Sequence, residues 1–244
     1  MAIRSLLKNT PFYAAYFVNR HAHRLSEWTA SDDKALNFYL PLVQPGDLVF
    51  DVGANVGERS KIFRMCGARV IAIEPQPLCV RVIKRAWDDV TVVQCAVSDT
   101  VRSDKLYLTS FHPHASMSAD WKGGSRTMDI HTTTLDLLIE CYGIPAFIKI
   151  DVEGHEIQVL RGLSQPIQLV SFEFHDDRLP DAMACFERLQ QLGDYEFNYC
   201  VEEEQSFQSG WVTRAAIEAG LFQRPPHYGD IYARLRARSV VSNP

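Results

Sequence analysis

Residues 50–57 carry the sequence FDVGANVG, directly after the apolar residues Leu48 and Val49. A buried strand followed by a glycine turn and a helix is typical of parallel α/β sheets, which bind ligands at the carboxyl ends of their strands. Glycines there let the backbone approach a ligand because no Cβ intervenes, and the following helix offers unpaired N–H groups. Taken alone, this spacing also fits an ordinary strand-to-helix turn.

Short β-branched and apolar runs alternate with segments of helical period after this turn, which predicts a mostly parallel sheet flanked by helices. Strands are expected at 48–50, 69–73, 90–93, 106–108, 147–150 and 169–172 and near Tyr195 and Ile231, and helices from about Gly57 and Leu78 and at 135–141, 154–161 and 183–191. The polar stretch 98–133 includes a His-, Ser- and Gly-rich loop, 112–125, with His112 and His114. We expect a substrate-facing flap or local disorder there.

The 244 residues are 46% hydrophobic, which is enough for one catalytic domain. We place this domain at 44–244, after an N-terminal helical extension or lid at 1–43. The net charge of -5, from 25 basic and 30 acidic residues, gives no electrostatic reason to bind nucleic acid. Small-molecule or glycan partners are expected, and the sequence leaves the oligomeric state open.

The aromatic run 12–18 in the extension is far shorter than the roughly 20 apolar residues of a membrane span. We expect a helix packed on the domain. A membrane-surface helix is the alternative, because Arg20, His21, His23 and Arg24 follow the aromatic residues. The six cysteines form no C-x-x-C pair and fall in apolar stretches, which predicts buried, reduced thiols of a cytoplasmic protein.

Glu74 closes the second expected strand, where a carboxylate can accept hydrogen bonds from a ribose diol. The glycine loop and this acid together indicate an adenosine-containing ligand. Asn55 stands where a dinucleotide fingerprint has its second glycine, and Asp51 would repel a pyrophosphate but suit the ammonium of a methionine. The expected cofactor is therefore S-adenosylmethionine.

Three blocks of the sequence carry a resemblance to a known family: FDVGANVG at 50–57, Glu74-Pro75, and TLDLL…FIKIDVEGHEIQVLRG at 134–162, with a looser likeness in CAVSD at 95–99. With these blocks the chain resembles the FkbM family of class I S-adenosylmethionine-dependent methyltransferases. The resemblance covers roughly 44–174. It implies a Rossmann-like class I methyltransferase fold with a seven-stranded sheet and helices on both faces. It also implies O-methylation of a hydroxyl on a sugar, glycan or related natural product.

The resemblance further implies that residues of the glycine loop hold the methionine end of the cofactor, that Glu74 holds the ribose, and that residues after the third strand border the adenine. The predicted cofactor-binding residues are Asp51, Gly53, Ala54, Asn55, Gly57, Glu74, Ala96, Val97 and Asp99. For Asp99, a simple turn role after Ser98 is an equal alternative.

A second acidic cluster, 151–156, follows the strand 147–150 and is expected beside the cofactor loop, with Glu173, His175, Asp176 and Asp177 after the next strand. Asp151 or His155 could act as a general base, with Glu173 as a further catalytic residue. Alternatively, Asp151, Glu173 and His175 could converge on a divalent metal. Glu153 and Glu156 could instead only complement a helix N-terminus, and we assign Glu156 that structural role.

Two other functions remain open. A nicotinamide-dependent oxidoreductase would explain the sheet and Glu74 but needs a pyrophosphate loop, which this chain lacks. A non-catalytic binding protein on the same fold would be expected to have lost an acid such as Asp51, Glu74 or Asp151. All three are present.

Overall fold

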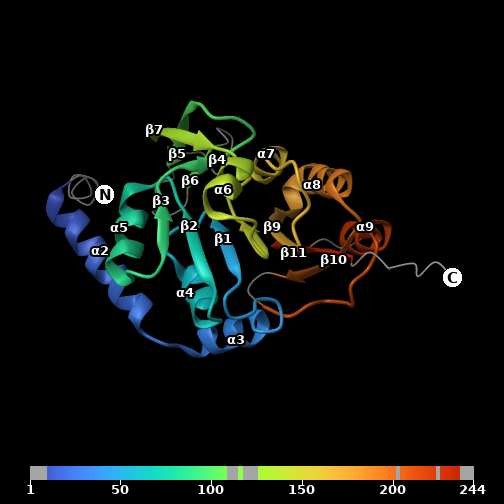
Figure 1. Ribbon diagram of the computed structural model, residues 1–244, viewed down its shortest axis with the longest axis horizontal. Coiled ribbons are helices and arrows are strands. Elements are labelled where there is room, and N and C mark those ends of the chain that lie inside the picture. Colours follow the sequence, from blue (N-terminus) through green and yellow to red (C-terminus); the bar gives the residue numbers. More distant parts are fainter. Residues whose placement is uncertain (1–9, 109–114, 118–125, 202–203, 224–225, 237–244) are drawn as a thin grey trace.

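The computed structural model describes residues 10–108, 115–117, 126–201, 204–223 and 226–236. Among these residues a seven-stranded sheet has the order β10-β11-β9-β8-β1-β2-β3 (Figure 1). Its strands are β1 (Leu48–Val52), β2 (Arg69–Ile73), β3 (Thr91–Val93), β8 (Phe147–Ile150), β9 (Leu169–His175), β10 (Tyr195–Val201) and β11 (Tyr228–Leu235). β11 pairs antiparallel with β9 and β10, and the other pairs are parallel. The predicted mostly parallel, Rossmann-like sheet is confirmed.

Helices cover both faces of this sheet, which explains why its central strands are continuous apolar runs. On one face lie α3 (Ala30–Tyr39), α4 (Glu58–Met65) and α5 (Pro77–Ala86), and on the other α6 (Leu135–Tyr142), α7 (Glu156–Arg161), α8 (Leu179–Leu192) and α9 (Arg214–Gln223) (Figure 1). All residues of β1 and β8 are buried. The strands thus fix where their carboxyl ends present polar side chains.

The N-terminal extension forms α2 (Pro11–Ser26) and α3. Thr10 caps α2 by accepting a hydrogen bond from the backbone of Tyr13. The helix packs on α5, burying Phe17 and Val18 on its inner face, while Phe12 is 82% exposed on the outer one. No described helix is long and apolar enough to cross a membrane. Membrane-surface contact through α2 stays a prediction.

A smaller sheet fills part of the stretch expected to be an irregular flap. It contains β4 (Ala96–Val97), β5 (Ser103–Leu108), β6 (Ala115–Ser116) and β7 (Arg126–Thr133), in the order β4-β7-β5-β6. Polar residues alternate with the buried Ile130 and Thr132 in β7, which pairs with both β5 and β4. The sequence reading missed β7 because so few of its residues are apolar. His112, His114 and most of the loop 112–125 lie outside the described residues.

The six cysteines are free thiols. Cys66, Cys79, Cys185 and Cys200 are buried as expected, and Cys95 is half-buried. Cys141 is exposed, so the expectation of burial is wrong there, because it lies on the outer side of α6. Cellular location stays a prediction.

Candidate active site

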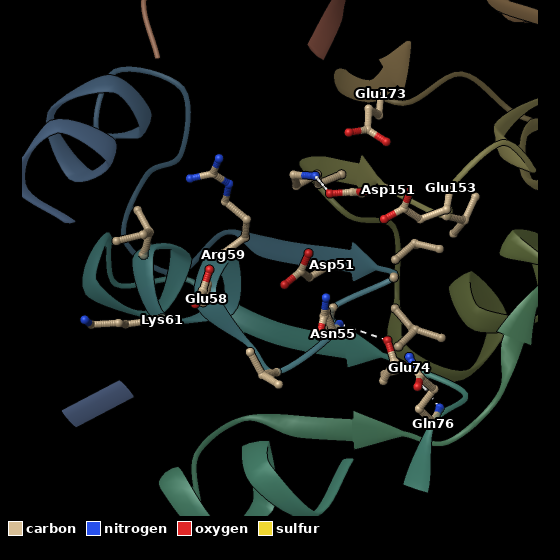
Figure 2. A pocket seen from close by; sticks show the side chains of 18 of the residues that line it. Asp51, Asn55, Glu58, Arg59, Lys61, Glu74, Gln76, Asp151, Glu153 and Glu173 are labelled. Carbon is tan, nitrogen blue, oxygen red and sulfur yellow. Dashed lines mark hydrogen bonds and ion pairs between the residues drawn. The ribbon is translucent and has the colours of Figure 1, made fainter. Parts of the chain in front are cut away.

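A cleft of about 830 Å³ lies at the carboxyl ends of the central parallel strands, and its size suits a small-molecule site. Residues at or directly after the carboxyl ends of β1, β2, β8 and β9 line it, and residues from α2 to α4 form a further wall. Figure 2 shows acidic side chains from several of these strand ends directed toward the same space. The sheet therefore brings together side chains that are far apart in the sequence.

The glycine loop enters the cleft between β1 and α4. Gly53 has a φ of +82°, and a Cβ added there would lie 1.8 Å from the backbone oxygen of Asp151. Only glycine allows this close crossing. Gly53, Ala54 and Asn55 line the cleft, whereas Gly57 faces Ile83 and Trp87 of α5. The structure therefore does not bring Gly57 into the site and gives it a role in the turn before α4.

Glu74 ties the end of β2 to this loop. Its carboxylate, 4% exposed, accepts hydrogen bonds from the backbone N–H groups of Asn55 at 2.9 Å and Gln76 at 2.8 Å (Figure 2). Burial raises its pKa to about 7 despite these two donors. A carboxylate has about four lone-pair sites. The side chain of Gln76 also hydrogen-bonds to this carboxylate, so one site remains for a hydroxyl group of a ligand in the cleft.

Asp51 is almost fully buried at the end of β1 and also lines the cleft. The hydroxyl of Ser60 donates to its Oδ2 at 2.6 Å. Burial raises the pKa of Asp51, although the ammonium of Lys149 acts in the opposite direction. A cationic ligand group beside Asp51 would compensate its buried charge.

Only some of the residues predicted to border the adenine line the cleft. Ala96 and Val97 of β4 line the cleft together with Cys95. Asp99 does not line it, because its carboxylate pairs with the guanidinium of Arg102 at 2.8 Å. Asp99 therefore takes the turn role given above as its alternative.

Asp151 lines the opposite wall, where Lys149 of β8 holds it at 2.8 Å. Lys149 itself is 2% exposed, with Asp230 of β11 as a second carboxylate at 3.9 Å. Burial alone would raise the pKa of Asp151, but the charge of Lys149 overrides this and holds the pKa below its usual value. Asp151 is thus ionised and a weak proton acceptor.

Glu173 lies beside Asp151 because β8 and β9 pair in register, with Ile150 opposite Phe172. The Nε2 atom of His175 is 3.2 Å from a carboxylate oxygen of Glu173, and both residues line the cleft. Burial, and then the charge of Asp151, raise the pKa of Glu173 to about 8. The two neighbouring acids therefore have opposite pKa shifts, which suits different roles in proton transfer.

His155 is the predicted catalytic residue that the structure does not bring into the cleft. Glu153 and Gly154 have positive φ angles and turn the chain there, so that the Nε2 atom of His155 meets the Oγ of Ser98 at 3.1 Å. Burial, with a smaller contribution from Arg102, lowers its pKa to about 4. Glu156 accepts backbone hydrogen bonds from Val152 and Gly154, in line with its expected structural role.

The structure also changes the set of residues that could bind a divalent metal. Asp151 is held by Lys149, and the described residues instead bring Glu153 together with Glu173 and His175, with potential ligand atoms within 4.8 Å of one another. Carboxylates and imidazole can hold a divalent ion. Asp176 pairs with His227, and neither Asp176 nor Asp177 lines the cleft.

Sequence reasoning missed several lining residues. They include Arg24, Thr29, Ser31, Asp32, Arg59, Lys149 and Tyr228. A signal existed for Lys149, which is a charged residue inside the apolar strand FIKI and therefore needs a buried partner. No local pattern places α2 and α3 against the cleft.

Comparison with known proteins extends this picture. A sequence model described as the methyltransferase FkbM domain matches residues 51–202. The hexuronic acid methyltransferase AglP of Haloferax volcanii is 29% identical over 188 residues, or 70% of this chain and 74% of the relative. The 31-O-demethyl-FK506 methyltransferase FkbM of Streptomyces tacrolimicus is 31% identical over 175 residues, or 55% and 67%.

A solved structure supports the fold alone. The TehB-like SAM-dependent methyltransferase from Corynebacterium glutamicum superposes with a TM-score of 0.51 at 9% identity. The superposition covers 93% of this chain and 100% of the other.

Proposed function

This chain belongs to the FkbM methyltransferase family, and from that premise we propose that it transfers a methyl group from S-adenosylmethionine to a hydroxyl of a sugar or glycan-like acceptor. The observation that carries the proposal is one cleft that joins Asp51 and Glu74 to the acids Asp151 and Glu173. Methyl transfer to a hydroxyl needs a donor site and a proton acceptor side by side. The cleft offers residues for both.

The described residues fit the donor. Glu74 retains a lone pair for a ribose hydroxyl, and Asp51 provides a buried negative charge for the cationic methionine end. The bound donor supplies an electrophilic methyl group on a sulfonium. The loop has no glycine pattern for a pyrophosphate, which together with the family removes the support for an oxidoreductase.

Glu173 is the best candidate for the base. An alcohol is a poor nucleophile while it keeps its proton, and a base works best when its pKa lies near the working pH. The raised pKa of Glu173, about 8, meets this condition, whereas Asp151 is too acidic. Asp151 instead accepts a hydrogen bond from a neighbouring hydroxyl of the acceptor and so orients it, while His175 fixes the Glu173 carboxylate that takes the proton of the reacting hydroxyl.

A sugar-like acceptor suits the chemistry of this wall. Asp151, Glu153 and Glu173 present carboxylate oxygens, which accept hydrogen bonds from neighbouring hydroxyls. The rings of His175 and Tyr228 stack at a centroid distance of 6.0 Å and add a flat surface. The names of two relatives, for hexuronic acid and for a 31-O-demethyl compound, support an oxygen acceptor.

The test uses S-adenosylmethionine labelled in its methyl group and a panel of acceptors that contains uronic acid glycosides and the matching neutral glycosides. A methyl ether survives mild alkali, whereas a methyl ester is hydrolysed, so alkali treatment distinguishes a hydroxyl acceptor from a carboxylate. We expect alkali-stable label with at least one glycoside. Alkali-labile label alone would show that the acceptor group is a carboxylate and would contradict the proposal.

A further inference from the structure

The segment 27–32, here called the elbow, comprises the connection between α2 and α3 and the first turn of α3, and it lies outside the region matched by the family. It nevertheless contributes Glu27, Thr29, Ser31 and Asp32 to the wall of the cleft. Arg24, near the end of α2, also lines the cleft. The N-terminal extension is therefore part of the site.

The elbow has a defined local structure. Thr29 and Asp32 form a reciprocal capping box at the start of α3, in which Asp32 accepts from the backbone of Thr29 at 2.7 Å. The indole N–H of Trp28 donates to Asp33 at 2.7 Å. These contacts stabilise the conformation of the segment but do not attach it to the sheet.

Lys61 of α4 makes that attachment. Its ammonium donates to the backbone oxygen of Glu27 at 2.5 Å, pairs with Asp32 at 3.0 Å and lies 4.9 Å from the ring centre of Trp28. Lys61 is only 8% exposed, so these contacts are shielded from water. Since α4 follows the glycine loop directly, Lys61 links the elbow to the helix that bounds the donor site.

The direction of the cleft indicates what the elbow faces. Figure 2 shows Glu74 on one side of Asp51, and Arg59 and Lys61 on the other side, along α4. A donor whose ribose lies at Glu74 and whose methionine ammonium lies beside Asp51 directs the carboxylate of its amino-acid end toward α4 and the elbow. Arg59 lies at this end in Figure 2, Arg24 also lines the cleft, and the guanidinium group of an arginine suits a carboxylate.

We propose that the elbow and Arg24 form the subsite for the amino-acid end of S-adenosylmethionine, and that Lys61 holds this subsite in place. Lys61 also lines the cleft, and we assign it a positioning role because its ammonium contacts Glu27, Asp32 and Trp28 of the elbow. The inference rests on the proposed donor site but not on the identity of the acceptor.

A comparison of two ligands distinguishes this positioning role of Lys61 from a general effect on the stability of the fold. S-adenosylhomocysteine carries the amino-acid end, whereas 5′-methylthioadenosine shares the adenosine and the thioether but lacks that end. In calorimetry, Lys61→Met should lower the affinity for S-adenosylhomocysteine about 10- to 100-fold, as expected for the loss of a charged hydrogen bond. The same substitution should change the affinity for 5′-methylthioadenosine by less than about twofold. Lys61→Arg should restore part of the affinity, and the exposed Lys34→Met is the matched control.

Hydrogen exchange on the unmodified protein provides a second readout that needs no variant. S-adenosylhomocysteine should protect the amides of the elbow, and 5′-methylthioadenosine should not. The proposal would be overturned if Lys61→Met lost affinity equally for both ligands or lost none for either. It would also be overturned if S-adenosylhomocysteine did not protect the elbow. Unchanged donor binding with a raised KM for the acceptor would overturn it as well. A failure to find a hydroxyl acceptor would leave these binding results intact, so the two failures are distinguishable.

Discussion

The ammonium of Lys149 lies 2.8 Å from the carboxylate of Asp151, at the carboxyl end of β8 and inside the cleft. The next strand presents Glu173, which is paired with the imidazole of His175 and not with a lysine. One lysine therefore makes two adjacent acids chemically different. Asp151 stays ionised and fixed in direction, and Glu173 can exchange a proton near neutral pH.

Lys149→Met should destabilise the fold, because it leaves the carboxylates of Asp151 and Asp230 without their shared cation. Removing one partner of a buried ion pair costs about 3–5 kcal/mol. The side chain of Asp151 is 37% exposed, so we expect the lower end of that range, about 3 kcal/mol. Chemical denaturation measures it, with the exposed Lys105→Met as control. Equal stability of the two variants would contradict a structural role for the pair.

Glu173→Gln should lower turnover by about 10² to 10⁴, the usual contribution of a positioned base. The active form of Glu173 is its carboxylate, so the rate should rise with pH and level off above about 8. His155→Gln, at a buried histidine outside the cleft, should lower turnover by less than about tenfold. Normal turnover of Glu173→Gln on its acceptor would eliminate this base.

Asp151→Asn tests the coupling between the two acids. The charge of Asp151 helps to raise the pKa of Glu173, so removing it should move the rise in rate to lower pH. Turnover at the new plateau should fall less than in Glu173→Gln. A pH profile of the variant over pH 5–9 measures the shift, and an unchanged profile would show that Asp151 does not act on the base.

A chelator distinguishes a mechanism that uses a divalent metal from direct proton transfer to Glu173. If Glu173 accepts the proton directly, enzyme dialysed against EDTA keeps its turnover. If Glu153, Glu173 and His175 hold a divalent ion, EDTA abolishes turnover and added Mg²⁺ or Mn²⁺ restores it. Glu153→Gln should then prevent this restoration. We expect the first outcome, because His175 already orients Glu173.

Local sequence patterns predicted the parts of the site that lie at strand ends. The strands 69–73 and 147–150 have the predicted bounds, and Glu74 and Asp51 follow from where buried strands stop. The physical reason is that apolar runs fix the strands, and parallel strands end at a common edge.

Other parts depend on tertiary contacts that no local pattern contains. His155 belongs to the same motif as Asp151, but the positive φ angles of Glu153 and Gly154 turn it toward Ser98. The extension supplies a wall of the cleft because Lys61 binds the elbow across the chain. Neither feature has a periodicity that a sequence reading could detect.

Glu74→Ala should weaken the binding of S-adenosylhomocysteine by about 1–3 kcal/mol, since hydroxyl donors of the ligand lose a charged acceptor. The pKa of Glu74 in the free protein is about 7, and the ionised form is the better acceptor. Affinity should therefore fall as the pH decreases below about 7, by at most tenfold per unit. Calorimetry over pH 5.5–8.5 measures this dependence. Glu74→Gln should flatten it, and an equally steep dependence in that variant would assign it to another group.

Gly53→Ala and Gly46→Ala form a matched pair that tests how the glycine loop crosses β8. Both glycines have a positive φ, +82° and +88°, so alanine costs about 1–2 kcal/mol of backbone strain at either position. At Gly46 a Cβ meets nothing within 4 Å, so the strain is the whole effect. At Gly53 the Cβ would lie 1.8 Å from the backbone oxygen of Asp151, so the loop or Asp151 must move.

That movement would disturb the hydrogen bond from the Asp151 backbone to Val52 and separate the two halves of the site. We therefore expect Gly53→Ala to be less stable than Gly46→Ala in chemical denaturation and to lose S-adenosylhomocysteine binding in calorimetry, while Gly46→Ala binds normally. If Gly53→Ala is as stable as Gly46→Ala and binds as the unmodified protein does, the loop does not cross Asp151 at this distance. The site must then tolerate a wider separation of the donor loop from the acid wall, and the close approach of the two cannot be the source of its activity.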